Sequence, residues 1–251
     1  MDLSQFQQAV ELLRSAQHIS VLTGAGVSAE SGIPTFRASD GLWEGHAIEE
    51  VATPQGYRRN PQLVWDFYHA RREKAAQVQP NPGHVALAAL EQRWAGRFDL
   101  ITQNVDGLHQ RAGNLRVHEL HGSLWRSRCT ECGDIAAIPA DFPRTPTCKL
   151  CGGALRPDIV WFGEMLPGDV FRDAEFAAVE CDLMLVVGTS AVVYPAAGLI
   201  PLAKTSSRAN NVVAAQVIEI NISPSSASDH VDVGLYGPSG EILPQLLATL
   251  D

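Results

Sequence analysis

Runs of consecutive apolar residues set the framework of this chain. They occupy residues 19–23, 98–102, 183–187 and 217–220, and such short runs are typical of buried parallel strands. Residues 115–120 alternate more between apolar and polar side chains, and we expect a further strand there. Because helical or mixed segments separate these runs, the sequence predicts an α/β fold built on a doubly wound parallel sheet.

The N-terminus follows a helical pattern instead. Leu3, Phe6, Val10 and Leu13 have the 3-4-3 spacing of an amphipathic helix, which differs from a secretory signal. No apolar run approaches membrane-spanning length, so we expect no membrane association and a cytoplasmic location. Cys181 lies beside a predicted buried strand and is expected to be a core residue.

Composition excludes some classes of function. The chain has 251 residues, of which 45% are hydrophobic and 19% charged, as in ordinary globular proteins. Its formal net charge of −9 argues against nucleic acid as the main partner.

The first apolar run leads into a glycine turn. Gly24, Gly26 and Ala29 form G-x-G-x-x-A between a predicted strand and a predicted helix, where glycine lets a pyrophosphate approach the backbone. A dehydrogenase would place an acidic residue about 20 positions later, at the end of a second strand. Glu44 is near that distance but lies in a predicted loop at 41–45. The turn therefore suggests a bound dinucleotide that is held in a different way from that in dehydrogenases.

Four cysteines form two C-x-x-C pairs. Cys129, Cys132, Cys148 and Cys151 have a spacing typical of a tetrahedral zinc site, and glycine follows each pair. Two disulfides or unrelated thiols are the alternatives. Four sulfur ligands would leave no open position for water, so we expect a structural zinc ion and place the chemistry elsewhere.

Polar residues follow several predicted strands at their carboxyl ends, where parallel sheets bind nucleotides. These segments are residues 102–109, 119–122, 188–190 and 221–223. The pattern predicts that they converge on one crevice.

Together these segments resemble the sirtuins, the NAD-dependent protein-lysine deacylases, and in particular their class III, bacterial-type members. The matching motifs occur in the family's order and span most of the chain. They are GAGVSAESGIPTFR from Gly24, TQNVDGLH from Thr102, HG at His121, both cysteine pairs, VWFGE from Val160 and GTS from Gly188.

The resemblance implies a division into two domains. A Rossmann-like, NAD-binding domain would comprise residues 1–38, 98–125 and 158–251. A smaller domain would combine a helical insert at 39–97 with a Cys₄ zinc ribbon at 126–157. The ribbon is too short for its own core, and zinc would stabilise it.

The resemblance also implies the reaction. NAD is consumed as a co-substrate, nicotinamide and free lysine are released, and the acyl group is transferred to ADP-ribose. His121 matches the catalytic base; a lone histidine is more often a core residue bonded to backbone, but this one follows a strand and precedes a glycine within a matching motif. His109 and His118 lack the following glycine, and we expect structural roles for them.

The implied NAD-binding residues form two groups. One would hold the nicotinamide half, and the other, which comprises Gly188, Thr189, Ser190, Asn221 and Ser223, would hold the adenosine half. Asn104, also implied in catalysis, and Asp106 match the nicotinamide-ribose and nicotinamide positions, although both residue types are also common helix caps. The full implied set is Gly24, Ala25, Gly26, Ala29, Thr35, Phe36, Arg37, Trp43, Gln103, Asn104, Asp106, Gly188, Thr189, Ser190, Asn221, Ser223 and Ser239.

A Tyr-x-x-Arg pair is informative about which acyl group would be removed. Tyr68 and Arg71 share a helix face, a pattern that is usually a solvated surface. In the sirtuins that remove succinyl and malonyl groups, this pair binds the acyl carboxylate. The resemblance therefore implies desuccinylation and demalonylation, with deacetylation as a second activity. Val160, Trp161 and Phe162 match the strand that binds the acyl-lysine peptide, and we expect a monomer.

Some positions depart from the family. Ser223 stands where an acidic residue is common, residues 205–211 form an unusually long polar loop, and Ser239 is assigned by placement alone.

Other functions stay open. A dehydrogenase with a structural zinc lacks its acidic residue here, and a zinc-ribbon module that binds nucleic acid conflicts with the negative charge. Transfer of ADP-ribose to protein, or deacetylation alone, is consistent with the same motifs.

Overall fold

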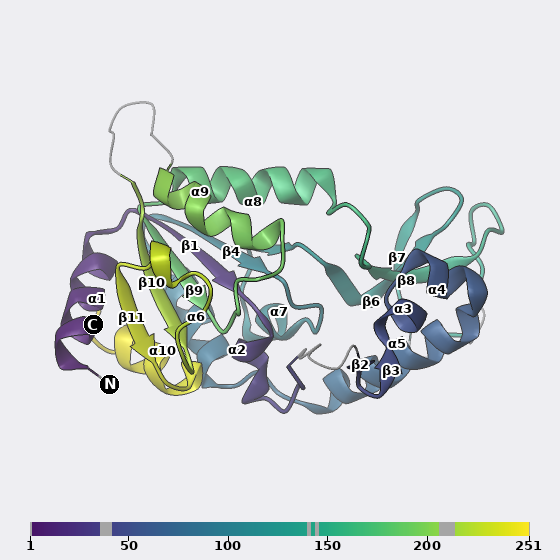
Figure 1. Cartoon of the computed structure of the whole chain (residues 1–251), viewed down its shortest axis with the longest axis horizontal. Helices are drawn as coiled ribbons and strands as arrows, with labels where there is room; N and C mark the ends of the chain where they lie inside the picture. The colour runs from purple at the N-terminus through teal and green to yellow at the C-terminus, as the bar shows by residue number, and fades with distance from the viewer. Residues whose placement is uncertain (1, 36–41, 140–141, 144–145, 206–213, 251) are drawn as a thin grey trace.

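The computed structural model describes residues 2–35, 42–139, 142–143, 146–205 and 214–250. Within these ranges no helix is both long enough and apolar enough to cross a membrane. Two parts are evident, a large domain around a six-stranded sheet and a smaller domain beside it (Figure 1).

The large sheet has the order β11-β10-β9-β1-β4-β5, and every neighbouring pair in it is parallel. Its strands are β1 (His18–Thr23), β4 (Arg97–Thr102), β5 (Val117–Glu119), β9 (Leu183–Val187), β10 (Gln216–Asn221) and β11 (Val233–Tyr236). The doubly wound sheet and all five expected strands are confirmed, whereas the edge strand β11 was not expected.

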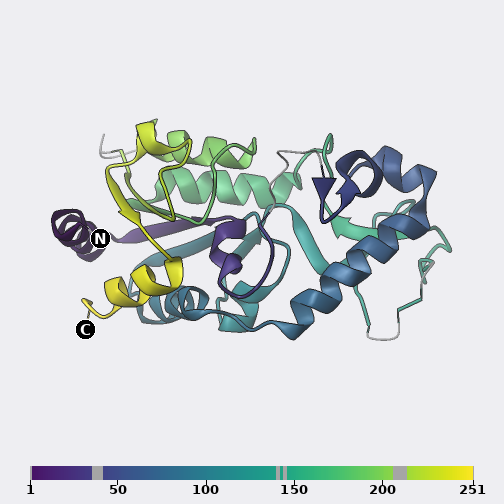
Figure 2. The same ribbon diagram turned by 60° about the horizontal axis from the view of Figure 1, so that its bottom comes forward.

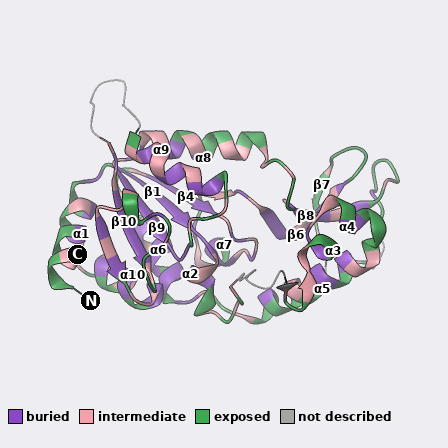
Figure 3. Ribbon diagram, in the orientation of Figure 1, coloured by how far each residue is buried: buried purple, intermediate pink, exposed green. Residues whose placement is uncertain are grey.

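Helices cover both faces of this sheet, because its strands bury side chains on both sides. One apolar cluster joins the sheet to α1 (Leu3–Ser15), α6 (Pro82–Arg93) and α10 (Ser239–Leu247). A second cluster joins it to α8 (Gly168–Glu180), η2 (Ala196–Gly198) and α9 (Leu199–Thr205). Figure 3 shows the inner strands β1, β4, β9 and β10 almost entirely buried between these layers, whereas the edge strands β5 and β11 are less buried. Cys181 is buried in the second cluster, as expected.

The smaller domain has its own apolar cluster. It contains α3 (Ile48–Val51), α4 (Pro54–Arg59), α5 (Pro61–Gln77) and an antiparallel sheet of β7 (Ile135–Ala137), β6 (Gly122–Cys129) and β8 (Leu155–Ile159). A short ribbon pairs β2 (Leu42–Trp43) with β3 (His46–Ala47). In the turned view, α5 runs diagonally along this domain (Figure 2).

Helix α6 refines the expected division of the chain. It lies within the segment 39–97 that was assigned to the helical insert, yet Ala86, Leu87 and Leu90 pack in the large-sheet cluster. Its buried apolar face therefore belongs with the large domain. The remaining domain boundaries stay predictions.

Short elements complete the described chain around the sheet's carboxyl edge. These are α2 (Ala25–Ala29) after β1, α7 (Leu108–Ala112) after β4, and η3 (Ser228–His230) after β10. Residues 206–211 of the expected polar loop lie outside the described residues.

Candidate active site

A cavity of about 1010 Å³ lies between the two domains, at the carboxyl ends of the large-sheet strands. Every described residue that the sequence nominated, apart from the cysteines, lines it. These are Gly24, Ala25, Gly26, Ala29, Thr35, Trp43, Tyr68, Arg71, Gln103, Asn104, Asp106, His121, Val160, Trp161, Phe162, Gly188, Thr189, Ser190, Asn221, Ser223 and Ser239. Phe36 and Arg37 lie outside the described residues.

The glycine turn crosses the end of β9 at backbone contact distance. Gly26 N donates to Gly188 O at 2.7 Å, and a Cβ on Gly26 would lie 2.7 Å from the same oxygen. Gly188 itself has a φ of +58°, and a Cβ there would lie 2.3 Å from Val27 N. Glycine is required at both positions, and the start of α2 is thereby fixed in the cavity wall.

Asn104 and Asp106 meet at one hydroxyl group. Asn104 Nδ2 donates to Ser28 Oγ at 3.1 Å and to Gly24 O at 3.0 Å. Ser28 Oγ donates to Asp106 Oδ2 at 2.7 Å, while Asp106 Oδ1 accepts from Leu108 N at 2.9 Å. The Asp106 carboxylate therefore bonds the first turn of α7, as the capping alternative predicted, and still faces the cavity. Burial raises the pKa of Asp106.

Two buried histidines lie behind this network. His84 Nε2 is 3.4 Å from Ser28 Oγ, and His109 Nε2 is 3.0 Å from Thr23 Oγ1. Burial lowers the pKa of His84 to about 4 and lowers the pKa of His109 well below its usual value, so both rings are neutral. His118 instead contacts Asp99 Oδ1 at 3.2 Å. The contacts of His109 and His118 agree with the structural roles expected for them.

His121 lies on the turn between β5 and β6. Its Nδ1 is 3.0 Å from Gln103 O, and because a carbonyl only accepts, Nδ1 carries the proton. Nε2 is then left with the lone pair. Burial lowers the pKa of His121, and the bond to Gln103 opposes that shift in part. The following Gly122 has a φ of +80°, and a Cβ on it would lie 2.0 Å from Asp158 O.

Tyr68 and Arg71 face the cavity from α5. Tyr68 is 1% exposed, and its hydroxyl accepts from Trp161 Nε1 at 3.0 Å. The Arg71 side chain is 10% exposed and stacks on Trp43, with 4.1 Å between Cζ and the ring centre. Arg71 Nη1 contacts Glu44 Oε1 at 3.3 Å. These burials exclude the alternative of a solvated helix surface.

Other residues of the implied NAD-binding set bond one another in the cavity wall. Gln103 Nε2 donates to Thr189 Oγ1 at 3.1 Å, and Asn221 Nδ2 donates to Thr189 O at 2.9 Å. Ser239 Oγ donates to Glu30 Oε1 at 3.0 Å, so its hydroxyl proton is already used. Glu30 also accepts from the start of α10, which makes Glu30 and Ser239 one local anchor.

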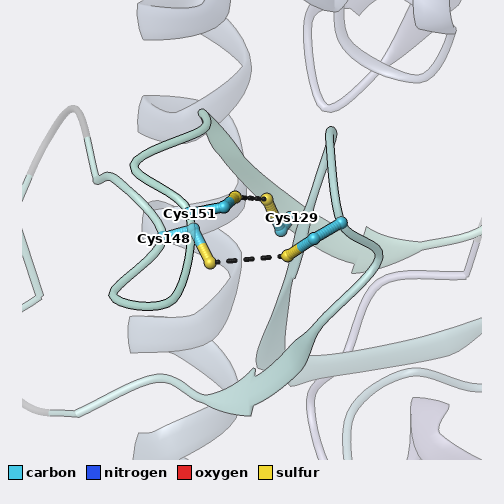
Figure 4. Close-up of side chains that lie close together, drawn as sticks. Cys129, Cys148 and Cys151 are labelled. Atoms are coloured by element: carbon cyan, nitrogen blue, oxygen red, sulfur yellow. Dashed lines mark hydrogen bonds between the residues drawn. The ribbon is translucent and has the colours of Figure 1, made fainter.

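The four paired cysteines meet beyond the cavity, in the smaller domain. Their sulfur atoms all lie within 4.8 Å of one another, and the distances Cys129–Cys151 and Cys132–Cys148 are 3.5 and 3.7 Å (Figure 4). Zinc–sulfur bonds of about 2.3 Å put tetrahedral sulfurs about 3.8 Å apart, whereas a disulfide needs about 2.05 Å. The thiols are free, and their arrangement fits a structural zinc ion.

Comparison with known proteins agrees with this geometry. Residues 24–195 match the Sir2 family. The chain belongs to the Sir2 family.

Its Sir2 relatives match it along nearly their whole length. The NAD-dependent protein deacylase 2 of Pyrobaculum aerophilum is 50% identical over 238 residues, which cover 94% of this chain and 92% of the relative. The NAD-dependent protein deacylase of Ralstonia nicotianae is 49% identical over 243 residues, with coverages of 96% and 95%. A solved mutant of a Sir2 homologue, in complex with ADP-ribose, superposes with a TM-score of 0.89 at 42% identity and covers 100% of this chain and 96% of that one.

Sequence reasoning about this Sir2 protein missed the roles of the buried Ser28 and of two cavity-lining residues, Glu30 and Glu44. Ser28 lies inside the glycine motif, four residues after Gly24. A hydroxyl-bearing residue at that place in the motif was the available signal. Glu30 and Glu44 gave no signal, since their partners Ser239 and Arg71 are far away in the sequence.

We predict that zinc is needed for the small-domain sheet, because the ribbon joins β6 to β8 through the cysteines. Replacing Cys148 by serine should abolish stoichiometric zinc and lower the melting temperature by several degrees, since Cys148 is buried in the domain's apolar cluster. Metal content and circular dichroism measure both effects. Cys181→Ala is the matched control and should retain one zinc per chain; equal zinc loss in both variants would contradict the assignment.

Proposed function

We propose that the protein is an NAD-dependent protein-lysine deacylase that removes succinyl and malonyl groups, with acetyl as a second substrate. One observation carries the reaction class: the neutral His121 ring, oriented by Gln103 O, shares a cavity with a glycine turn suited to a pyrophosphate. The names and complexes of the Sir2 relatives support NAD-dependent deacylation, without indicating which acyl group is removed.

The residues around the glycine turn would hold the co-substrate NAD. When bound, NAD would supply the ribose carbon that releases nicotinamide and the hydroxyl that receives the acyl group. Gly24 and Gly26 give a pyrophosphate close access to the backbone. Asn104 and Asp106, which both bond Ser28, would bind the nicotinamide half, and Asn221 would contact the adenosine half.

His121 would act as the general base. Since its Nδ1 proton is committed to Gln103 O, Nε2 is the nitrogen that can accept a proton from a ribose hydroxyl. Its lowered pKa keeps the ring neutral near pH 7 and ready to accept that proton. Anchoring by a backbone carbonyl also fixes the ring plane.

Tyr68 and Arg71 would recognise the acyl group. A guanidinium fork matches a carboxylate, and the buried hydroxyl of Tyr68 lies one helical turn from it. Arg71 is largely buried, so its charge favours an anionic acyl end over a neutral one.

The substrate would be a lysine side chain in an extended peptide. Phe162, Val192 and Tyr194 line the cavity and are 48%, 59% and 73% exposed, so two separate segments of its wall present apolar surface to solvent. A peptide could add between these segments through main-chain bonds, with little dependence on its sequence. A solved Sir2Af2 structure with a myristoylated histone peptide, at a TM-score of 0.78 and 36% identity, supports such binding. We expect the enzyme to act as a monomer in the cytoplasm.

The deciding experiment follows one peptide carrying acetyl-, succinyl- or malonyl-lysine by mass, with and without NAD. We expect NAD-dependent loss of all three groups, with one nicotinamide per lysine. Removal of acetyl alone would reject the acyl assignment. Nicotinamide release without acyl-lysine would favour ADP-ribose transfer instead.

We predict that His121→Ala lowers turnover at least about 100-fold, because general-base catalysis typically contributes that much. Zinc content and melting temperature should be retained.

In the unchanged enzyme the base must be neutral to accept a proton. Because the pKa of His121 is lowered in the folded protein, the rate should decrease on acidification only below about pH 6.5, the ordinary histidine pKa. A pH–rate profile for kcat/KM tests this; an acid limb centred above that value would contradict it.

We predict that Arg71→Met lowers kcat/KM for the succinyl peptide about 30-fold, the effect of about 2 kcal/mol for a charge-assisted bond. The acetyl peptide should change less than threefold. Arg72→Met, the neighbouring arginine on α5, does not line the cavity and is the matched control. An equal loss for both acyl groups would mean that Arg71 is structural.

A further inference from the structure

An acidic side chain, Glu44, lies in the acyl end of the cavity, and the proposed reaction gives it no role. Its carboxylate lies between two cations of α5. Oε1 is 3.3 Å from Arg71 Nη1, and Oε2 is 3.6 Å from Lys74 Nζ. The two cations are three residues apart and therefore neighbours on one helix face.

The turn that carries Glu44 is not explained by turn preferences. Trp43 pairs with His46 across the ribbon, which leaves a loop of two residues with φ values of +49° at Glu44 and +83° at Gly45. Such loops favour Asn-Gly or Asp-Gly, because both central residues adopt positive φ. Glutamate is unusual in this conformation, and strained residues concentrate at functional sites.

The pairing of Arg71 is incomplete. Its side chain is 10% exposed, so its charge requires a partner, and Glu44 supplies one at the long distance of 3.3 Å. Arg71 Nε is buried without a hydrogen-bond partner among the described residues. An incoming carboxylate could therefore form a better, forked pair with Arg71.

Lys74 gives Glu44 an alternative partner. Its side chain is 56% exposed and that of Glu44 is 23% exposed, so the pair lies toward solvent from Arg71. If an acyl carboxylate takes Arg71, Glu44 keeps a cation beside it. The exchange then leaves neither carboxylate unpaired.

We infer that Glu44 sets the balance between acidic and neutral acyl groups. This inference rests on the proposed binding of acyl carboxylates by Arg71. With a succinyl or malonyl group bound, Glu44 is a competing, repelling carboxylate and weakens binding. With an acetyl group bound, Glu44 keeps the buried Arg71 paired and makes the neutral group acceptable. Glu44 is thus a specificity-determining residue that allows one pocket to accept both classes.

The test is Glu44→Gln, which removes the charge and keeps the side-chain length. For the succinyl peptide we expect KM to fall about fivefold with kcat within twofold, because Glu44 lies at the acyl terminus and not at the reacting carbonyl. For the acetyl peptide we expect kcat/KM to fall a few-fold. The succinyl-to-acetyl preference should rise about tenfold.

Two further variants separate charge from structure. Glu44→Asn also removes the charge but suits the turn, so it should shift the preference in the same direction. Glu73→Gln makes the same charge change on α5, outside the cavity lining, and should leave the preference unchanged.

The outcomes distinguish this inference from the proposed function. An unchanged preference in Glu44→Gln, with desuccinylation by the unaltered enzyme, overturns the inference and leaves the proposed function standing. Desuccinylation that arises only in Glu44→Gln rejects the proposed activity of the unaltered enzyme but supports the role of Glu44. If neither protein removes succinyl groups, both proposals fail.

Discussion

The close crossing of two backbones at the carboxyl edge of the large sheet is the constraint on which the site depends. Gly26 and Gly188 approach so closely that either would clash if it carried a side chain. This contact brings the end of β1 against the end of β9 and fixes the direction in which α2 leaves the sheet. Ser28, and through it Asn104 and Asp106, takes its position from that crossing.

The second half of the site is added by the smaller domain through one continuous connection. The turn at His121 leads directly into β6, and Val160 N donates to His121 O at 3.0 Å. The proposed base is therefore bonded to the large domain by its ring and to the peptide-side segment by its backbone. Proton transfer and substrate placement share one short stretch of chain.

Much of this arrangement could be predicted from the sequence, because local patterns encode it. The buried strands are apolar runs, the cysteine spacing reflects the geometry of one ion, and the sirtuin motifs mark about half of the cavity wall. Strand β11 was not predicted, because only two of its residues, Val233 and Leu235, are deeply buried. Helix α6 was assigned to the wrong neighbour, since its apolar face does not indicate which sheet it covers. The pairs Glu30–Ser239 and Glu44–Arg71 join distant segments, and no local pattern reports such contacts.

Trp161 connects the cysteine ribbon to the proposed acyl pocket. Strand β8 begins four residues after Cys151, and it carries Arg156, whose guanidinium stacks on Trp161 at 3.4 Å while holding Glu164. Trp161 in turn donates to Tyr68. The wall of the proposed acyl pocket is therefore continuous with the ribbon that carries the four cysteines, and a bound zinc ion would stiffen both. If those sulfurs were oxidised, the proposed acyl pocket would be disturbed before the large domain, whose apolar clusters do not include them.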